Sequence, residues 1–180
     1  MKKSTKDITV CAVFAAVLCV LSPFTIPIGI IPISLGLFAV LTVSIILGAK
    51  KGVLTCALFI LIGALGLPVF SGFRGGVSVL AGATGGYIIS YVFVSLIVGV
   101  FSDKFKDKSV FDGVLIFLSC IVATLVCYTF GTIQYMAISS ADLKSALSLC
   151  VYPFIAIDLV KCAAAVVIGM TVRQRIKVFH

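Results

Sequence analysis

Long apolar runs, closed by glycine, proline or charged residues, make up most of this sequence. Hydrophobic residues account for 62% of the chain and charged residues for 11%, whereas a soluble domain carries about 25% charged residues. A soluble fold of 180 residues could not hide so much apolar surface from water. The sequence therefore predicts an all-α integral membrane protein with a single transmembrane domain over residues 1–180.

Six of these runs are candidate membrane-spanning helices. Their approximate bounds are 8–21, 33–47, 53–65, 86–101, 113–133 and 153–172. Several are shorter than the ~20 residues that cross the hydrocarbon core, and short or tilted helices would account for this. No small-x-small cleavage site follows the first run, so we interpret it as a retained helix rather than a signal peptide.

The connections between these runs differ in character. Three prolines predict a stiff, extended loop at 23–34, and residues 50–52, Lys-Lys-Gly, predict a tight turn. Ser139 or Ser140 is the expected N-cap of a short amphipathic helix within 134–150.

Basic residues are distributed unevenly between the predicted loops. The loops after helices 1, 3 and 5 carry two of them, Arg74 and Lys144, whereas the N-terminus, the other loops and the C-terminus carry eleven. The positive-inside rule therefore predicts that both termini are cytoplasmic. Short clusters of cations between apolar runs are a topology signal and do not indicate a nucleic-acid-binding face. The proline loop, the glycine-rich loop and residues 134–150 would share the outer face, where we expect a binding site.

Asp158 and Lys161 are ionisable residues inside the last apolar run. Their i, i+3 spacing places them on one face of a helix. Ionised side chains in such a helix face the bundle interior and mark functional sites by default. A carboxylate accepts from N–H groups, and an ammonium binds a carboxylate or carbonyl oxygen. The pair therefore suits a polar solute that carries both kinds of group; the alternative is a salt bridge that only locks helices together.

Residues 66–86, between the third and fourth helices, hold seven of the 16 glycines in the chain. No Lys-Ser or Lys-Thr follows them, so a phosphate loop is not favoured. Glycine allows sharp bends and the close approach of a ligand, and non-helical backbone at membrane depth must be buried or line a cavity. We therefore predict a lid or re-entrant wall, with a plain flexible loop as the alternative.

Arg74 is either an anion-binding guanidinium or a solvated loop residue. The candidate site residues in and beside this segment are Phe70, Arg74, Gly75, Gly76, Thr84 and Tyr87.

The rest of the sequence offers little catalytic or metal-binding chemistry. Its acidic residues are six Asp and no Glu, the single His is the last residue, and the seven Cys form no C-x-x-C pair. We therefore expect no catalytic set and no metal site, and we interpret the cysteines as small buried hydrophobes. Ala12 and Ala16 form a small-xxx-small face in the first helix, for which packing within the chain is the simplest explanation.

Three stretches together resemble the BioY family, the biotin-specific S component of energy-coupling-factor transporters. They are GLPVF-SGFRGG-VSVLAGATGGYIISY, the proline loop ending in IPISLGLFAV, and Asp158-Leu-Val-Lys161 in the last helix. The resemblance covers the whole chain. Ala83 stands where the family pattern has Pro, and Arg74 stands where a small polar residue is expected.

The resemblance implies a six-helix protein of the bacterial plasma membrane that captures biotin from outside, with the first and third outer loops over the site. Asp158 would meet the ureido N–H groups, and Lys161 the biotin carboxylate or the ureido oxygen. Ala12 and Ala16 would face a transmembrane coupling subunit, which joins two ATP-binding subunits that drive import. No cofactor is implied, since biotin is the transported ligand.

Three other functions remain open at this point. An S component for another water-soluble vitamin would share the fold but not this combination of motifs. A membrane enzyme that uses Asp158 would need a second acid or base at matching depth. A structural subunit or channel would bind no ligand.

Overall fold

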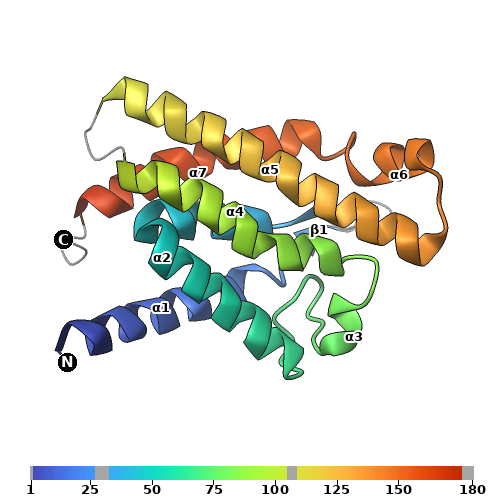
Figure 1. Ribbon diagram of the computed structural model, residues 1–180, viewed down its shortest axis with the longest axis horizontal. Coiled ribbons are helices and arrows are strands. Elements are labelled where there is room, and N and C mark those ends of the chain that lie inside the picture. The colour runs from blue at the N-terminus through green and yellow to red at the C-terminus, as the bar shows by residue number, and fades with distance from the viewer. Residues whose placement is uncertain (1, 27–32, 105–108, 176–180) are drawn as a thin grey trace.

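The computed structural model describes residues 2–26, 33–104 and 109–175. These residues form seven helices and two short strands (Figure 1). Their bounds are α1 Lys2–Leu21, β1 Thr25–Ile26, β2 Ile33–Ser34, α2 Gly36–Ala64, α3 Val77–Leu80, α4 Gly85–Lys104, α5 Val110–Ser139, α6 Leu143–Cys150 and α7 Ile155–Arg175.

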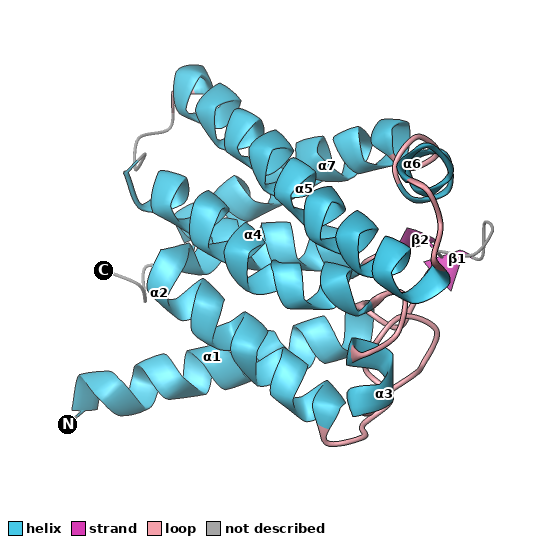
Figure 2. Ribbon diagram, turned by 45° about the vertical axis from the view of Figure 1, so that its right-hand side comes forward, coloured by secondary structure: helices cyan, strands magenta, loops and turns pink. Residues whose placement is uncertain are grey.

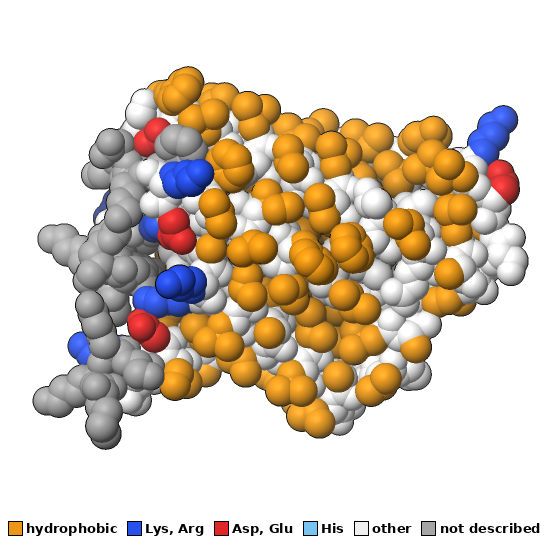
Figure 3. Space-filling view, in the orientation of Figure 1, with side chains coloured by type: hydrophobic (Ala, Val, Ile, Leu, Met, Phe, Trp, Pro, Cys, Tyr) orange, Lys and Arg blue, Asp and Glu red, His pale blue; other side chains and the backbone are white. Residues whose placement is uncertain are grey.

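The long helices run between two ends of the molecule (Figures 1 and 2). α1 begins and α7 ends at one of them, which we call the charged end because Asp7 pairs there with Lys51, and Asp103 with Arg173. Figure 3 shows charged side chains gathered at this end, beside a surface that is mostly apolar. β1, β2, α3 and α6 lie at the opposite end, which we call the loop end (Figure 2).

Four helices of the described residues, α2, α4, α5 and α7, are long and apolar enough to cross a membrane. Their mean hydropathies lie between 1.9 and 2.5. Large apolar side chains remain exposed along them, for example Leu125 and Val160. An apolar belt of this kind is stable only where lipid replaces water, so the chain is a membrane protein.

α2 is a pair of helical segments that meet at Gly48, whose φ of 76° and ψ of −176° lie outside the helical range. A Cβ on Gly52 would lie 3.4 Å from the Cα of Ser44, whereas residues eight apart in a straight helix are about 12 Å apart. The two segments therefore fold back on each other. The predicted turn at residues 50–52 is wrong by a few positions, because only glycine adopts the Gly48 conformation without strain.

Two other helices satisfy the backbone groups that are freed at this break. The Asp103 carboxylate, at the end of α4, accepts from Ala49 N at 2.9 Å. The Arg173 guanidinium, at the end of α7, donates to the Ile45 carbonyl at 2.7 Å and pairs with Asp103 Oδ1 at 3.1 Å. A carboxylate at a new helix N-terminus and a cation at the preceding C-terminus both complement the helix dipoles.

α2 packs against α1, α4 and α7, most extensively against α4. Small residues make the α2–α4 contact close, since a Cβ on Gly99 would clash with the backbone of Ala49. Ser44, Ser90 and Ser95 are fully buried in the same region. Such small side chains let helix backbones approach within a membrane.

The connections at the loop end differ from the prediction in two places. β1 and β2 pair antiparallel, Thr25 with Ser34, within a region expected to be only extended; the prediction for residues 27–32 lies outside the described residues. Ser139 and Ser140 are not the N-cap of α6. Ser140 ends α5 with a φ of 52°, and Asp142 caps α6 by accepting from Ser145 N at 3.4 Å. Hydrogen bonds from Ser145 also hold the pKa of Asp142 below its usual value.

Candidate functional site

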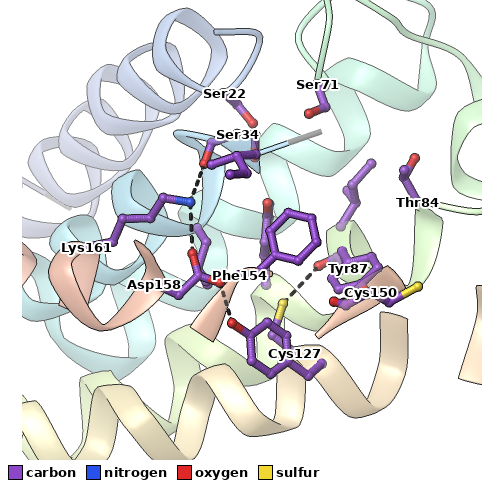
Figure 4. A pocket seen from close by; sticks show the side chains of 15 residues that line it. Ser22, Ser34, Ser71, Thr84, Tyr87, Cys127, Cys150, Phe154, Asp158 and Lys161 are labelled. Atoms are coloured by element: carbon purple, nitrogen blue, oxygen red, sulfur yellow. Dashed lines mark hydrogen bonds and ion pairs between the residues drawn. The ribbon is translucent and has the colours of Figure 1, made fainter. Parts of the chain in front are cut away.

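A cavity with an empty volume of about 650 Å³, counting the open space at its mouth, lies at the loop end (Figure 4). α2, α4, α5 and α7 contribute its walls, and the segments before α2 and α4 contribute its rim. Its charged and hydroxyl-bearing lining residues are Ser22, Ser34, Ser71, Thr84, Tyr87, Tyr91, Tyr128, Asp158 and Lys161.

Asp158 and Lys161 form an ion pair on one face of α7, as their spacing predicts. Lys161 Nζ lies 2.9 Å from Asp158 Oδ1. The side chains are only 11% exposed for Lys161 and 6% for Asp158, and both line the cavity. A buried ion pair is retained only where further hydrogen bonds satisfy the remaining atoms of each partner.

Two groups from distant parts of the chain supply those hydrogen bonds. Lys161 Nζ donates to the backbone carbonyl of Ser34, in β2, at 2.9 Å. The Tyr128 hydroxyl, in α5, donates to Asp158 Oδ2 at 2.6 Å. Figure 4 shows the contacts of Asp158 and Lys161 at one side of the cavity. The charged pair is thereby fixed between β2, α5 and α7.

Tyr87, near the start of α4, forms another wall of the cavity. Its hydroxyl donates to the Cys150 carbonyl at the end of α6, at 3.2 Å. Its ring lies so close to Gly131 of α5 that a Cβ there would clash with it. The absence of a side chain at Gly131 therefore sets where the Tyr87 ring lies.

The glycine-rich segment reaches the cavity through Ser71 and Thr84. Gly72 has a positive φ of 72°, and its N–H donates to the Pro23 carbonyl at 3.0 Å. This bond joins the segment to the chain that precedes β1. The glycine-rich segment and the chain that precedes β1 therefore lie side by side at the rim of the cavity.

Four of the predicted site residues lie outside the cavity lining. Phe70 is fully buried and meets Phe59 edge-on, with ring centroids 5.6 Å apart. Arg74 is exposed, and its Nε donates to the Ser71 carbonyl at 3.2 Å. Gly75 packs against the Leu67 carbonyl, and Gly76 precedes α3 with a φ of 95°. These residues shape the segment rather than the cavity surface.

The structure thus brings Asp158, Lys161, Tyr87 and Thr84 to one cavity and adds Tyr128 and the Ser34 carbonyl. A tyrosine in an apolar helix resembles a packing residue, and a backbone carbonyl carries no sequence signal. The one available clue to Tyr128 was that a buried phenol hydroxyl needs a partner.

Ala12 and Ala16 lie on the exposed face of α1, whereas Ala15 is buried. They are therefore not used for packing within the described part of the chain. Their face is separate from the cavity, whose lining includes no residue of α1.

The chemistry of the site is that of binding. It presents a carboxylate, an ammonium and hydroxyl groups within a largely apolar lining. Among the described residues, no group of three His, Cys, Asp or Glu side chains is placed to hold a metal ion. A small solute with N–H donors and carbonyl or carboxylate acceptors matches these groups.

Comparisons with known proteins agree on one family. A family model described as the BioY family matches residues 1–178. The chain is 34% identical over 164 residues to the probable biotin transporter BioY of Pyrococcus horikoshii, covering 91% of this chain and 94% of that protein. It is 32% identical over 163 residues to the biotin transporter BioY of Thermotoga maritima, covering 90% and 92%.

A solved structure has the same fold. It is the crystal structure of the S-component for biotin from an ECF-type ABC transporter, which the chain matches with a TM-score of 0.83 and 27% identity. The match covers 96% of this chain and 93% of the other.

Proposed function

The chain belongs to the BioY family, and from that premise we propose that it is the biotin-binding S component of an energy-coupling-factor transporter. It is a transport component and not an enzyme. The observation that carries this proposal is the buried Asp158–Lys161 pair in the wall of the cavity at the loop end.

The bicyclic ring of biotin carries a urea, with two N–H donors and one carbonyl, and its tail carries a carboxylate. In the proposed complex Asp158 accepts from one of the two ureido N–H groups. Lys161 uses its third N–H bond on the ureido oxygen or the carboxylate, since two are already directed to Asp158 and Ser34. Tyr87 and Thr84 line the remainder of the site.

We further propose that the chain crosses the bacterial plasma membrane six times, with both termini in the cytoplasm. α1, the two segments of α2, α4, α5 and α7 would be the six spans. The eleven basic residues of the N-terminus, C-terminus and even-numbered loops support this orientation. The cavity would then open to the outside.

The proposed partner is an energy-coupling module with a transmembrane coupling subunit and two ATP-binding subunits. The exposed Ala12 and Ala16 would contact the coupling subunit, since small side chains admit a close helix–helix approach. ATP hydrolysis in that module would drive release of biotin inward.

Equilibrium binding of biotin to the purified chain tests the proposal. We expect Asp158→Asn to weaken binding about 100-fold, as expected for loss of a charged hydrogen-bond acceptor. Asp7→Asn, at the charged end, is the matched control and should bind like the unaltered chain. Tight binding of thiamine or riboflavin in place of biotin would instead indicate an S component for another vitamin.

A further inference from the structure

We propose that Tyr128 is a positioning residue for recognition of one ring N–H group of the ligand, acting through the Asp158 carboxylate. This inference rests on the proposed function and deepens it. Tyr128 would set which way the carboxylate faces, so that a hydroxyl on α5 controls selectivity for a donor on the ligand.

The first observation is the hydrogen-bond inventory of Asp158. Oδ1 accepts from Lys161 at 2.9 Å, and Oδ2 accepts from Tyr128 at 2.6 Å. Each carboxylate oxygen has two lone pairs, so each retains one for a ligand. With both oxygens held by different helices, the carboxylate plane cannot rotate without breaking a charge-assisted bond.

The second observation is that Tyr128 and Asp158 also line another cavity, on the other side of the site. This second cavity has an empty volume of about 430 Å³ and lies between α5 and α7. Its other lining residues are Ile121, Thr124, Leu125, Val151, Ile155, Leu159 and Cys162. Leu125 and Leu159 are 56% and 42% exposed on candidate membrane spans, so this cavity faces the lipid.

Tyr128 and Asp158 therefore lie in the wall between the ligand cavity and this second cavity, which is an apolar groove. A carboxylate oxygen turned toward such a groove would find no water to hydrate it, which is costly. The Tyr128 hydroxyl removes this cost by donating to Oδ2, while its ring fills the wall. Phenylalanine would keep the wall but leave Oδ2 without this donor, so the carboxylate would rotate away from the groove and lose its orientation toward the ligand.

The test compares Tyr128→Phe with Tyr135→Phe in the purified full-length chain. Tyr135 lies on the same helix, is equally buried and lines neither cavity. Three ligands are titrated: biotin and the two analogues in which one ring N–H or the other is replaced by oxygen. We expect Tyr128→Phe to weaken biotin binding about 10- to 100-fold and Tyr135→Phe to leave it unchanged.

The analogues separate positioning from a general loss of structure. The analogue that lacks the N–H facing Asp158 donates no hydrogen bond to that carboxylate, so the orientation of the carboxylate matters little for its binding. Its affinity should therefore fall about threefold at most in Tyr128→Phe. The other analogue should lose as much affinity as biotin. Equal losses for all three ligands, or a biotin affinity unchanged by Tyr128→Phe, would overturn the inference.

An infrared measurement decides the underlying contact without a ligand. The carboxylate stretch of Asp158 is identified by its loss in Asp158→Asn. It should shift in Tyr128→Phe and stay in place in Tyr135→Phe; an unshifted band would overturn the inference. If the unaltered chain fails to bind biotin, the proposed function fails while this measurement still gives its own answer.

Discussion

Lys161 is fixed by two hydrogen bonds, one to Asp158 and one to the Ser34 carbonyl. Replacing it with Ala would leave the Asp158 carboxylate buried without a counter-ion. We expect a loss of about 3–5 kcal/mol in the free energy of unfolding, together with loss of biotin binding. Denaturant unfolding in detergent and biotin titration would measure the two effects.

The double variant Asp158→Asn/Lys161→Ala separates these effects. It removes both charges, so most of the stability should return while binding stays lost. Lys51→Ala is the control, because the Lys51–Asp7 pair is far more exposed and such pairs contribute about 1 kcal/mol or less. A double variant as unstable as Lys161→Ala would contradict the assignment of a coupled buried pair.

The polar pair could be predicted from the sequence because charge is rare in an apolar helix and the spacing fixes the face. The role of Tyr128 could not be predicted, because nothing in the sequence indicates whether a tyrosine hydroxyl will contact lipid headgroups, the backbone or a carboxylate. Phe70 is expected at the site because it flanks the glycines, and Arg74 because a guanidinium can bind an anionic group. Their orientation depends on positive φ angles at Gly66, Gly72 and Phe73, which no local pattern specifies.

At the scale of helices, Gly131 sets the fit between α4 and α5. A Cβ there would clash with the Tyr87 ring, so Gly131→Ala should push the ring into the cavity and weaken biotin binding about tenfold. The expected loss of stability is about 1–3 kcal/mol, as for overpacking. Affinity and unfolding midpoint are the measurements.

Gly113→Ala is the matched control on the same helix. Its new Cβ would lie 3.6 Å from the flexible Met170 side chain, so it should bind biotin normally and gain slightly in stability from lower chain entropy. Equal effects of the two substitutions would argue against a specific role for the Gly131–Tyr87 contact.

The break in α2 gives a second prediction for helices. Asp103→Ala removes the acceptor for Ala49 N–H and the partner of Arg173. We expect a loss of about 1–2 kcal/mol, similar to that of a helix cap, measured by unfolding. Lys104→Ala, at the adjacent exposed position, should change stability far less. Faster hydrogen exchange at Ala49 in the first variant would identify the cap as the cause.

The positions of the long helices were largely predictable, because apolar runs mark them whatever their packing; the six membrane crossings stay a prediction. The position of the reversal in α2 was not predictable. Gly48 and Gly52 both fit a turn locally, and tertiary packing decides between them: Gly52 is needed for the close approach to Ser44 and Ser95, which leaves Gly48 to make the turn. The cap of α6 was missed for a similar reason, since Ser139 and Ser140 still belong to the end of α5.

At the scale of the whole molecule, the proposed orientation can be tested with single cysteines. Lys144→Cys at the loop end should react with a membrane-impermeant maleimide in intact cells, and Lys50→Cys at the charged end only after permeabilisation. Of the seven native cysteines, six are buried and Cys19 is half-buried, so background labelling should be low. The reverse pattern would place the cavity on the cytoplasmic side.

The exposed face of α1 gives the other prediction at this scale. Ala12→Leu/Ala16→Leu adds bulk where the coupling subunit is proposed to pack, so biotin uptake in cells should fall about tenfold or more while binding to the purified chain stays within about twofold. Val122→Leu is the control, since Val122 is 52% exposed on α5, a helix on the opposite side of the molecule from α1 (Figure 2). Uptake unaffected by the alanine changes would exclude this face as the contact.

The bond between Lys161 and the Ser34 carbonyl joins residues 127 positions apart, and this separation has a consequence for biosynthesis. A ribosome moving at about 5–20 residues per second needs about 6–25 s to pass from one to the other. During that time α2, α4 and α5 are synthesised, and the Ser34 carbonyl is without its charged partner on α7 for the whole interval. Nascent chains stalled before α7 therefore lack the ion pair, and capture of ligand reports that α7 has been synthesised and has packed against β2 and α5.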